Sequence, residues 1–311
     1  MLDVKRMRVI KDVAARGSFS GAADALSYTQ SAVSQQIAAL EREAGAVLVE
    51  RNARGVRLTD AGSALVAHAD AILARLDAAE RELEAIAGLR GGHLRLVAFP
   101  SAASSLMPLA VAEFRRRHPA VELSLEPGEP AEAMEALKAG QCDVALSLEA
   151  SFEPFADDAI AKTPLLDDPM FLVLPGGHPL ARKPDLRLED LAEEAFIQGA
   201  IGTCPDTRIL LRAGNAAGFE PRIAFQSNDY TAIQGFIAAG VGVGLIPDLA
   251  LNSVRDDIVI RDLGGQVTSR RIFVSTLAGS YRSPATSAMV DILEEIGCDY
   301  ERGRRKLALA S

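Results

Sequence analysis

The chain has 311 residues, of which 49% are hydrophobic and 24% charged, a composition typical of globular proteins with more than one domain. No apolar run approaches the ~20 residues of a membrane-spanning helix, and the first residues lack the apolar segment of a signal peptide. The net charge of −9 argues against a nucleic-acid binder, yet residues 1–60 carry nine basic and seven acidic residues. We therefore expect a cytoplasmic protein, not associated with membranes, whose N-terminal end alone suits phosphate contacts.

Three short helices are predicted within residues 1–45. Ser18 or Ser20 suits the N-cap of the second helix, which ends near Leu26, and Thr29 suits the N-cap of the third. The predicted buried face of the third helix follows a helical period and consists of Val33, Ile37, Leu40 and Ala44. Its opposite face carries Gln30, Ser31, Ser34, Gln35, Ala38 and Arg42.

The second and third helices, joined by a tight turn, are typical of a helix-turn-helix. In this motif the second helix enters the major groove of DNA with its N-terminal residues leading, and amide and hydroxyl side chains match the base edges there. Arg51, Arg54 and Arg57 then surround a glycine-containing turn, which suits a wing along the phosphate backbone. A solvated amphipathic helix without a DNA role stays open as the alternative on periodicity alone.

A long helix is predicted from about Asp60 to Ala87, because this segment lacks proline and holds glycine only near its start. Its apolar residues form a seven-residue repeat, made of Leu58, Leu65, Ile72, Ala79 and Ile86 in one row and Ala69, Leu76 and Leu83 in the other. Such a seam favours a two-stranded coiled coil between two copies of the chain. The alternative is a helix packed on its own chain. The glycines at 88, 91 and 92 are expected to form a hinge.

From His93 onward strands and helices alternate, which indicates an α/β fold with largely parallel pairing. Helices are predicted from Ser104 to His118 and from Pro130 to Ala139. Strands are predicted at residues 93–99, 121–126, 142–148, 171–175, 195–198, 222–225, 243–247 and 271–276. The roughly 220 residues of this part favour two lobes, with a ligand at the carboxyl ends of strands.

Several blocks of the sequence resemble the LysR-type transcriptional regulators. They are GSFSGAADALSYTQSAVSQQIAALEREAG, ERNARGVRLTDAG, the heptad helix, LRLVAFPSAASSLMP, EALKAGQCDVAL and FIAAGVGVGLIP. The resemblance implies a winged helix-turn-helix in 1–58, a dimerisation helix and hinge in 59–90, and an effector-binding domain in 91–311 that resembles periplasmic binding proteins. Lobe I of this domain would comprise about 91–162 and 269–300, and lobe II about 163–268.

The same resemblance implies a bacterial transcriptional regulator that binds double-stranded promoter DNA in a sequence-specific manner. It implies assembly as a dimer through the long helix, and as a tetramer that is a dimer of dimers. A small-molecule effector bound between the two lobes would alter DNA bending.

The resemblance also gives candidate site residues. The DNA-binding candidates are Gln30, Ser31, Ser34 and Gln35 at bases or nearby phosphates, Arg51 and Arg54 in the wing, and Ser18, Thr29 and Arg42 beside them. The effector-binding candidates are Ser101, Ala102, Glu129, Ile201, Thr203, Asn228 and Asp229. The alternative for each effector-binding position is an ordinary residue of a loop at a strand end.

Two of these positions give a more specific expectation about the effector. Ser101 is predicted to precede the helix that starts at Ser104, whose free backbone amides suit a carboxylate. Glu129 stands where the family often has a small polar residue, and a carboxylate there repels an acidic ligand unless it is paired. A purely acidic effector is therefore less expected, and a ligand with an amine or hydroxyl beside its acid stays open.

The three cysteines are far apart in the sequence, which argues against a disulfide framework and a cysteine-rich zinc site. Cys142 is interpreted as a core residue. Cys204 lies at a predicted helix start, which could lower its thiol pKa, and peroxide-sensing family members have a reactive cysteine in this region. Cys298 is too distant in sequence to be an obvious resolving partner, so redox sensing is the minor alternative.

Enzymatic chemistry finds little support in the sequence. The four histidines are scattered, so no metal site and no cofactor is expected. Asp167–Asp168 and Glu193–Glu194 are interpreted as surface charge, and GVGVG at 240–244 leads from a helix into a strand, opposite to a dinucleotide-binding loop. An α/β enzyme and a solute-binding protein are the competing functions. The first lacks a nucleophile–base pair, and the second does not account for the first ninety residues.

Overall fold

The computed structural model describes residues 1–52, 55–86, 92–200, 204–279 and 282–308. Two compact units make up the chain, one of Met1–Leu89 with Lys138–Gln141 and the other of Arg90–Leu137 with Cys142–Ser311. Within the described ranges, no helix has both the length and the apolar character needed to cross a membrane.

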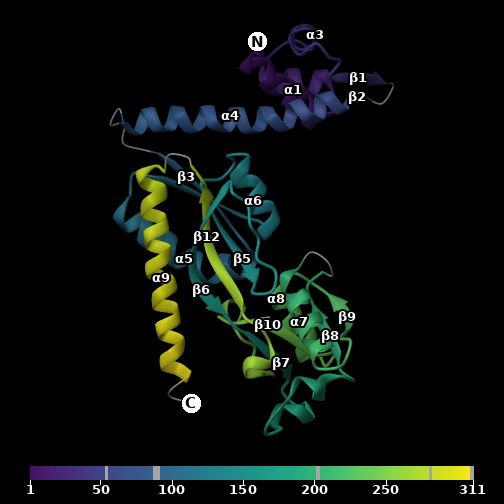
Figure 1. Ribbon diagram of the computed structural model, residues 1–311, viewed down its shortest axis with the longest axis vertical. Helices are drawn as coiled ribbons and strands as arrows, with labels where there is room; N and C mark the ends of the chain where they lie inside the picture. Colours follow the sequence, from purple (N-terminus) through teal and green to yellow (C-terminus); the bar gives the residue numbers. More distant parts are fainter. Residues whose placement is uncertain (53–54, 87–91, 201–203, 280–281, 309–311) are drawn as a thin grey trace. The chain divides into compact units, whose positions relative to one another are not determined.

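The N-terminal unit consists of three short helices, a hairpin and one long helix (Figure 1). The helices are α1 (Val4–Arg16), α2 (Phe19–Leu26), α3 (Gln30–Ala44) and α4 (Asp60–Ile86), and the antiparallel hairpin pairs β1 (Val49–Asn52) with β2 (Gly55–Leu58). Of the two candidate N-caps of α2, Ser18 is the cap and Ser20 lies inside the helix, and the expected cap Thr29 of α3 is confirmed. The Ser18 hydroxyl accepts from the Gly21 amide at 3.1 Å, and the Thr29 hydroxyl accepts from the Ala32 amide at 3.2 Å.

The buried face of α3 is largely the predicted one. Val33, Ile37 and Leu40 are at most 2% exposed and pack in one core with residues of α1 and α2. The prediction is wrong for Ala44, which is exposed. The helix ends there, at Gly45 with a φ of 69°, so its last turn extends past the core that covers the earlier turns.

The apolar seam of α4 is divided between two environments. Leu65 is 9% exposed and belongs to the core of its own unit. Ile72, Leu76 and Leu83, farther along the helix, are 41%, 38% and 66% exposed. The first part of the seam therefore packs on its own chain, as the alternative interpretation held, whereas these three side chains stay largely accessible.

The first lobe of the C-terminal unit contains a five-stranded sheet. Its order is β4 (Glu122–Pro127), β3 (His93–Ala98), β5 (Val144–Ala150), β12 (Arg270–Leu277) and β6 (Ile160–Asp168). Strand β3 is parallel to β4 and β5, but β12 is antiparallel to β5 and β6. The predicted largely parallel pairing is therefore wrong. Strand β6 follows β5 without a crossover helix, and β12 returns from the second lobe in the opposite direction.

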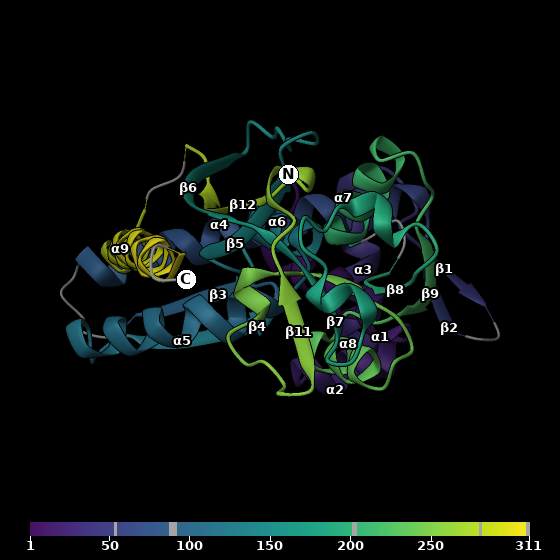
Figure 2. The same ribbon diagram turned by 90° about the horizontal axis from the view of Figure 1, so that it is seen from below.

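Helices cover both faces of this sheet. Helices α5 (Pro100–Arg117) and α9 (Pro284–Ala308) lie side by side on one face, and α6 (Pro130–Lys138) packs on the other (Figures 1 and 2). The side chains of β3 point alternately to the two faces of the sheet. Leu94 and Leu96 pack in the core beneath α5 and α9, whereas Val97 packs in the core beneath α6.

The second lobe has two smaller sheets. In the three-stranded sheet, β7 (Met170–Pro175) pairs antiparallel with β10 (Gly244–Pro247) and β11 (Ile258–Arg261), and in the two-stranded sheet β8 (Ala195–Gln198) pairs parallel with β9 (Arg222–Gln226). Helices α7 (Pro205–Ala216) and α8 (Tyr230–Ala238) pack against these strands, and single 3-10 turns connect the rest. Strands β6 and β11 were not predicted. The chain crosses between the lobes after β6 and before β12, so the ends of these two strands lie at the boundary.

Candidate functional site

The exposed face of α3 carries short polar side chains. Gln30, Ser31 and Gln35 are exposed and Ser34 is half-buried, whereas the opposite face is closed in the core. The Thr29 and Ser31 hydroxyls lie 3.0 Å apart at the start of the helix. This end therefore presents amides, hydroxyls and the first backbone N–H groups of a helix, all of which suit base edges or phosphates.

Contacts along its length hold α3 in place. The Arg6 side chain of α1 donates to Gln36 at 3.1 Å and forms an ion pair with Glu43. The Glu41 carboxylate accepts from the Leu48 amide at 2.9 Å, which joins α3 to the start of the hairpin. These contacts hold α3 against α1 and against the start of the hairpin. They therefore fix the position of its polar N-terminal end within the N-terminal unit.

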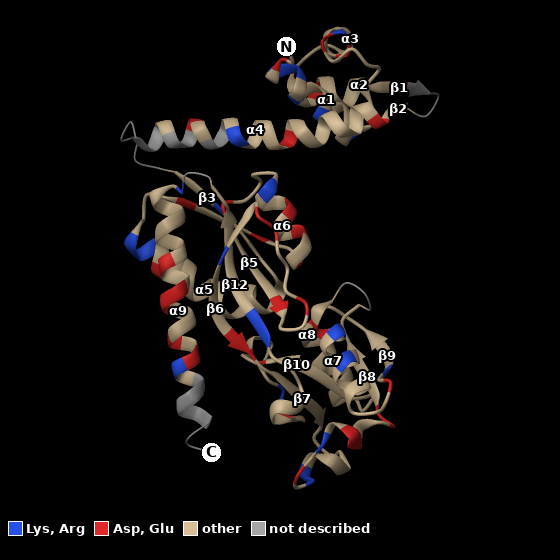
Figure 3. Cartoon of the chain, in the orientation of Figure 1, with Lys and Arg blue, Asp and Glu red and all other residues tan. Residues whose placement is uncertain are grey.

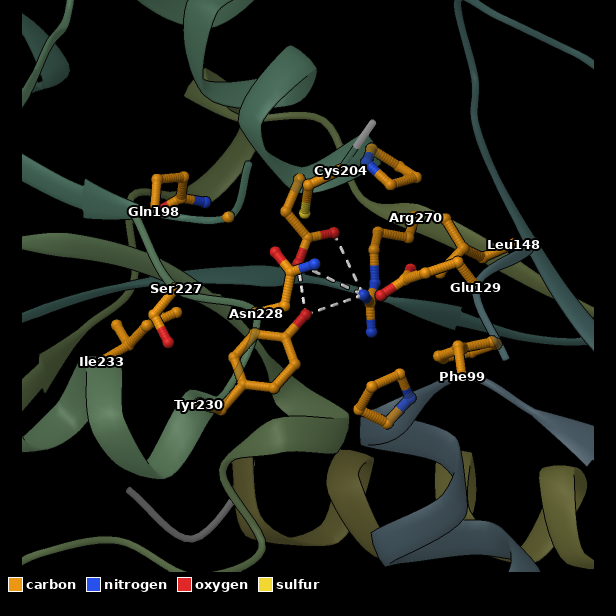
Figure 4. A pocket seen from close by; sticks show the side chains of 14 residues that line it. Phe99, Glu129, Leu148, Gln198, Cys204, Ser227, Asn228, Tyr230, Ile233 and Arg270 are labelled. Atoms are coloured by element: carbon orange, nitrogen blue, oxygen red, sulfur yellow. Dashed lines mark hydrogen bonds and ion pairs between the residues drawn. The ribbon is translucent and has the colours of Figure 1, made fainter. Parts of the chain in front are cut away.

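A buried arginine lies at the boundary between the two lobes of the C-terminal unit (Figure 4). Arg270, the first residue of β12, is 1% exposed, and its Nε donates to Asp168 of β6 at 3.0 Å. Its Nη1 lies 3.0 Å from Asp206 Oδ1, and its Nη2 donates to the Ser101 hydroxyl at 2.9 Å. Figure 3 shows the corresponding acidic segment at the end of β6 beside the basic segment of β12.

These partners come from both lobes. Ser101 lies in the first turn of α5 in the first lobe, whereas Asp206 and Tyr230 start α7 and α8 in the second. The Tyr230 hydroxyl donates to Asp206 at 2.6 Å. One guanidinium therefore connects the two lobes through Ser101, Asp168 and Asp206, each at most 1% exposed.

The ionisation of this cluster follows from burial and charge. Burial lowers the pKa of Arg270, but the Asp206 and Asp168 carboxylates outweigh it and hold that pKa well above its usual value. Burial, reinforced by the neighbouring Asp206 carboxylate, raises the pKa of Tyr230 well above 10, so its phenol stays a neutral donor. Burial also raises the pKa of Asp168, and the adjacent Arg270 opposes this shift.

A cleft opens beside this cluster. Its walls include Phe99 and Glu129 from the first lobe and Cys204, Asn228 and Tyr230 from the second (Figure 4). The free volume is about 20 Å³, room for roughly one water molecule. An adjoining open groove of about 690 Å³ shares Asn228 and Tyr230 with the cleft.

Two family models match the chain. A model described as a bacterial regulatory helix-turn-helix protein of the lysR family matches residues 4–63, and one described as a LysR substrate binding domain matches residues 87–297. The chain belongs to the LysR family of transcriptional regulators. The N-terminal unit thus carries the helix-turn-helix of a LysR regulator, and the two-lobed part is its effector-binding domain.

Relatives cover nearly the whole chain. The probable HTH-type transcriptional regulator LrrA of Synechococcus elongatus is 30% identical over 294 residues, 94% of this chain and 97% of that protein. The transcriptional dual regulator GltC of Bacillus subtilis is 31% identical over 257 residues, 79% and 81% of the two chains. Both relatives are described as transcriptional regulators, the class of protein expected from the sequence.

Solved structures share the fold. The crystal structure of CbnR, a LysR family transcriptional regulator, superposes with a TM-score of 0.70 at 23% identity and covers 95% of this chain and 99% of that one. A full-length OxyR variant from Pseudomonas aeruginosa gives a TM-score of 0.71 at 23% identity, with 94% and 98% covered.

The effector-binding candidates of this LysR domain are only partly brought together. Glu129 and Asn228 line the cleft, whereas Asp229 lines the adjoining groove and caps α8 by accepting from the Thr231 amide at 2.8 Å. Ser101 and Ala102 are buried beneath the cleft wall, at 1% and 0% exposure. Ile201 and Thr203 lie outside the described residues, so their roles stay predictions.

The expected position of Ser101 is wrong. Helix α5 begins at Pro100, not at Ser104, and Ser101 therefore lies within its first turn. Proline is well suited to the first position of a helix because its fixed φ fits and its missing N–H is not needed there. The Ser101 hydroxyl accepts from Arg270, and its backbone carbonyl accepts from the Ser105 hydroxyl at 2.6 Å.

Three further interpretations are settled by burial. Cys142 is 4% exposed, so its assignment to the core is confirmed. Asp168 is fully buried, which corrects its assignment to the surface, whereas Asp167 is 59% exposed. Burial, reinforced by Asp206, raises the pKa of Cys204, the opposite of the lowering expected at a helix start and of what a peroxide-reactive thiol needs.

The DNA-binding candidates divide in a similar way. Ser18 and Thr29 are helix caps, and Arg42 is exposed in the last turn of α3. Arg51 lies on β1, but its side chain is not described, and Arg54 lies outside the described residues. The wing contacts therefore stay predictions.

Sequence reasoning missed the residues of the buried cluster beside the cleft, namely Arg270, Asp206, Tyr230 and Asp168. One signal was available, because an arginine at the start of a largely buried strand needs a carboxylate partner if its side chain points into the core. The partners could not be chosen from the sequence, because they lie 102 positions away for Asp168 and 64 for Asp206.

Proposed function

We propose that the N-terminal end of α3 enters the major groove of promoter DNA, where Gln30, Ser31 and Gln35 read base edges. The observation that carries this proposal is the polar face of α3, exposed along its first turns while Val33 and Ile37 anchor the opposite face. Ser34 lies at the border of this face.

Phosphate contacts complete the proposed DNA interface. We assign them to Ser18 and Thr29 at the helix starts, to Arg42, and to Arg51 and Arg54 of the wing. Such contacts fix the register of the protein on the duplex and make binding depend on salt, whereas the α3 side chains supply sequence preference.

A second copy of the chain is the proposed partner of α4. Ile72, Leu76 and Leu83 are large apolar side chains exposed at coiled-coil spacing, and a matching helix would cover them. A dimer with two α3 helices suits paired half-sites in a promoter, and two such dimers would form the tetramer. We expect Leu83→Lys to give monomers in sedimentation velocity, and an unchanged oligomer would contradict the α4 interface.

The C-terminal unit is proposed to bind a small-molecule effector between its lobes. The cleft lies where the chain crosses between the sheets, so a ligand there would bias the relative position of the lobes. In this scheme residues 1–58 bind DNA, 59–90 link and dimerise, and 91–311 receive the signal, with the protein acting on cytoplasmic DNA.

The DNA proposal can be tested by fluorescence anisotropy with the DNA upstream of the protein's own gene. We expect Gln35→Ala to change the preference among sequence variants by roughly tenfold at one position. Arg42→Ala should weaken all sequences alike and reduce the salt slope by about one. Arg115→Ala, which removes an exposed arginine of α5, is the control and should change neither. Equal effects of Gln35→Ala and Arg42→Ala on every sequence would refute the groove assignment.

A further inference from the structure

The guanidinium of Arg270 has no N–H left for a ligand. Its contacts are Nε and Nη2 to Asp168, Nη2 to Ser101, and Nη1 to Asp206 and to the Tyr230 hydroxyl. These five contacts equal the five N–H groups of an arginine side chain. An acidic effector would therefore have to displace buried protein carboxylates to reach the one arginine among the residues lining the described cleft.

Glu129 is in the opposite situation. It precedes α6 and lines the cleft from the first lobe (Figure 4). Its backbone amide donates to Glu132, but within the described part of the chain no hydrogen bond or ion pair engages its side-chain carboxylate. Partial burial is the main cause that raises the pKa of Glu129; the Asp206 and Glu132 carboxylates add to this shift, and Arg270 opposes it.

The charges of the cleft do not balance. Arg270 supplies one positive charge, whereas Asp206 and Glu129 of the cleft lining and Asp168 of the adjoining buried cluster supply up to three negative ones. Asp168 and Asp206 both bind Arg270, and Asp206 also accepts from the Tyr230 phenol. Among the described residues, the carboxylate of this group that lacks a hydrogen-bond partner is that of Glu129. A bound cation would supply the missing charge, whereas a bound carboxylate would add to the repulsion.

The space in the cleft agrees with this charge. The free volume of about 20 Å³ accepts a group the size of one water molecule, which is also the size of an ammonium group. The adjoining groove of about 690 Å³ provides room for the rest of a molecule and shares Asn228 and Tyr230 with the cleft.

We propose that the effector of this cleft carries a protonated amine, whose hydrogen bonds are accepted by Glu129 while its carbon skeleton lies in the adjoining groove. This inference rests on the proposed role of the cleft as the effector site and names the chemical class of its ligand. Specificity against carboxylates follows, because every donor of Arg270 is already engaged.

The test compares three four-carbon probes that differ only in their end groups: putrescine, succinate and 1,4-butanediol. Thermal unfolding of the full chain is followed against the concentration of each probe at constant ionic strength. We expect putrescine alone to raise the unfolding temperature in a saturable manner. Glu129→Gln should weaken the apparent affinity by roughly tenfold to a hundredfold, since it removes a charged hydrogen-bond acceptor of nearly unchanged shape.

Glu220→Gln is the matched control, because Glu220 is exposed outside the cleft and the substitution changes the net charge equally. Three results would overturn the proposal: no saturable effect of putrescine, a comparable effect of succinate, or unchanged putrescine binding in Glu129→Gln. Anisotropy with promoter DNA separates this inference from the proposed function. DNA binding without amine binding defeats only the effector class, whereas loss of sequence-preferring DNA binding defeats the regulatory proposal.

Discussion

Replacing Arg270 with methionine should destabilise the C-terminal unit severely. The substitution keeps an apolar chain of similar length but leaves Asp168 at 0% and Asp206 at 1% exposure without their cation. Removing one partner of a buried ion pair costs about 3–5 kcal/mol, because the remaining charge stays desolvated. For a unit of this size each kcal/mol corresponds to roughly 2–4 °C, so the unfolding temperature should fall by on the order of 10 °C.

The neighbouring residue provides the control for this experiment. Arg271 follows on the same strand, is 58% exposed, and lies 3.5 Å from the equally exposed Asp167. Circular dichroism melts of Arg271→Met should therefore show a loss of no more than about 1 kcal/mol. Adding Asp168→Asn and Asp206→Asn to Arg270→Met should recover part of the stability by removing the stranded charges. Equal melts for Arg270→Met and Arg271→Met would refute the reasoning.

Two further predictions concern thiols and packing. Burial raises the pKa of Cys142 to about 12, so Ellman's reagent should label the exposed Cys298 in the native protein and Cys142 only after unfolding. In the unfolded chain a cysteine thiol ionises near pH 8.5. The contribution of Cys142 to the free energy of unfolding is therefore fully present below that pH and is lost as the pH rises toward 12. Urea titrations at pH 7 and pH 10 measure this loss. Gly62→Ala should destabilise the N-terminal unit by about 1–3 kcal/mol or more, because its Cβ would lie 2.0 Å from the Leu48 carbonyl oxygen. The exposed Ser63→Ala is the control in denaturant unfolding, and equal stability of the two variants would contradict this packing.

Local sequence patterns are enough to predict most of the N-terminal unit. The caps at Ser18 and Thr29, the bounds of α2 and α4, and the burial of Val33, Ile37 and Leu40 depend on residues within a few positions of each other. Hydrogen bonds of a helix and its caps are local, so short-range patterns suffice to predict them. The exposed polar face of α3 follows directly from that periodicity.

The cleft between the two lobes depends on contacts that form only in the tertiary structure. Arg270 meets Ser101 across 169 positions of sequence, and its partners converge from β6, α5, α7 and α8. Because β12 runs antiparallel to β5 and β6, its first residue, Arg270, lies beside these partners. Nothing in the local sequence of the strand indicates its direction. A buried charge is paired with the carboxylates that the fold places beside it, so the sequence could name Glu129 and Asn228 as candidates but not the buried cluster beside them.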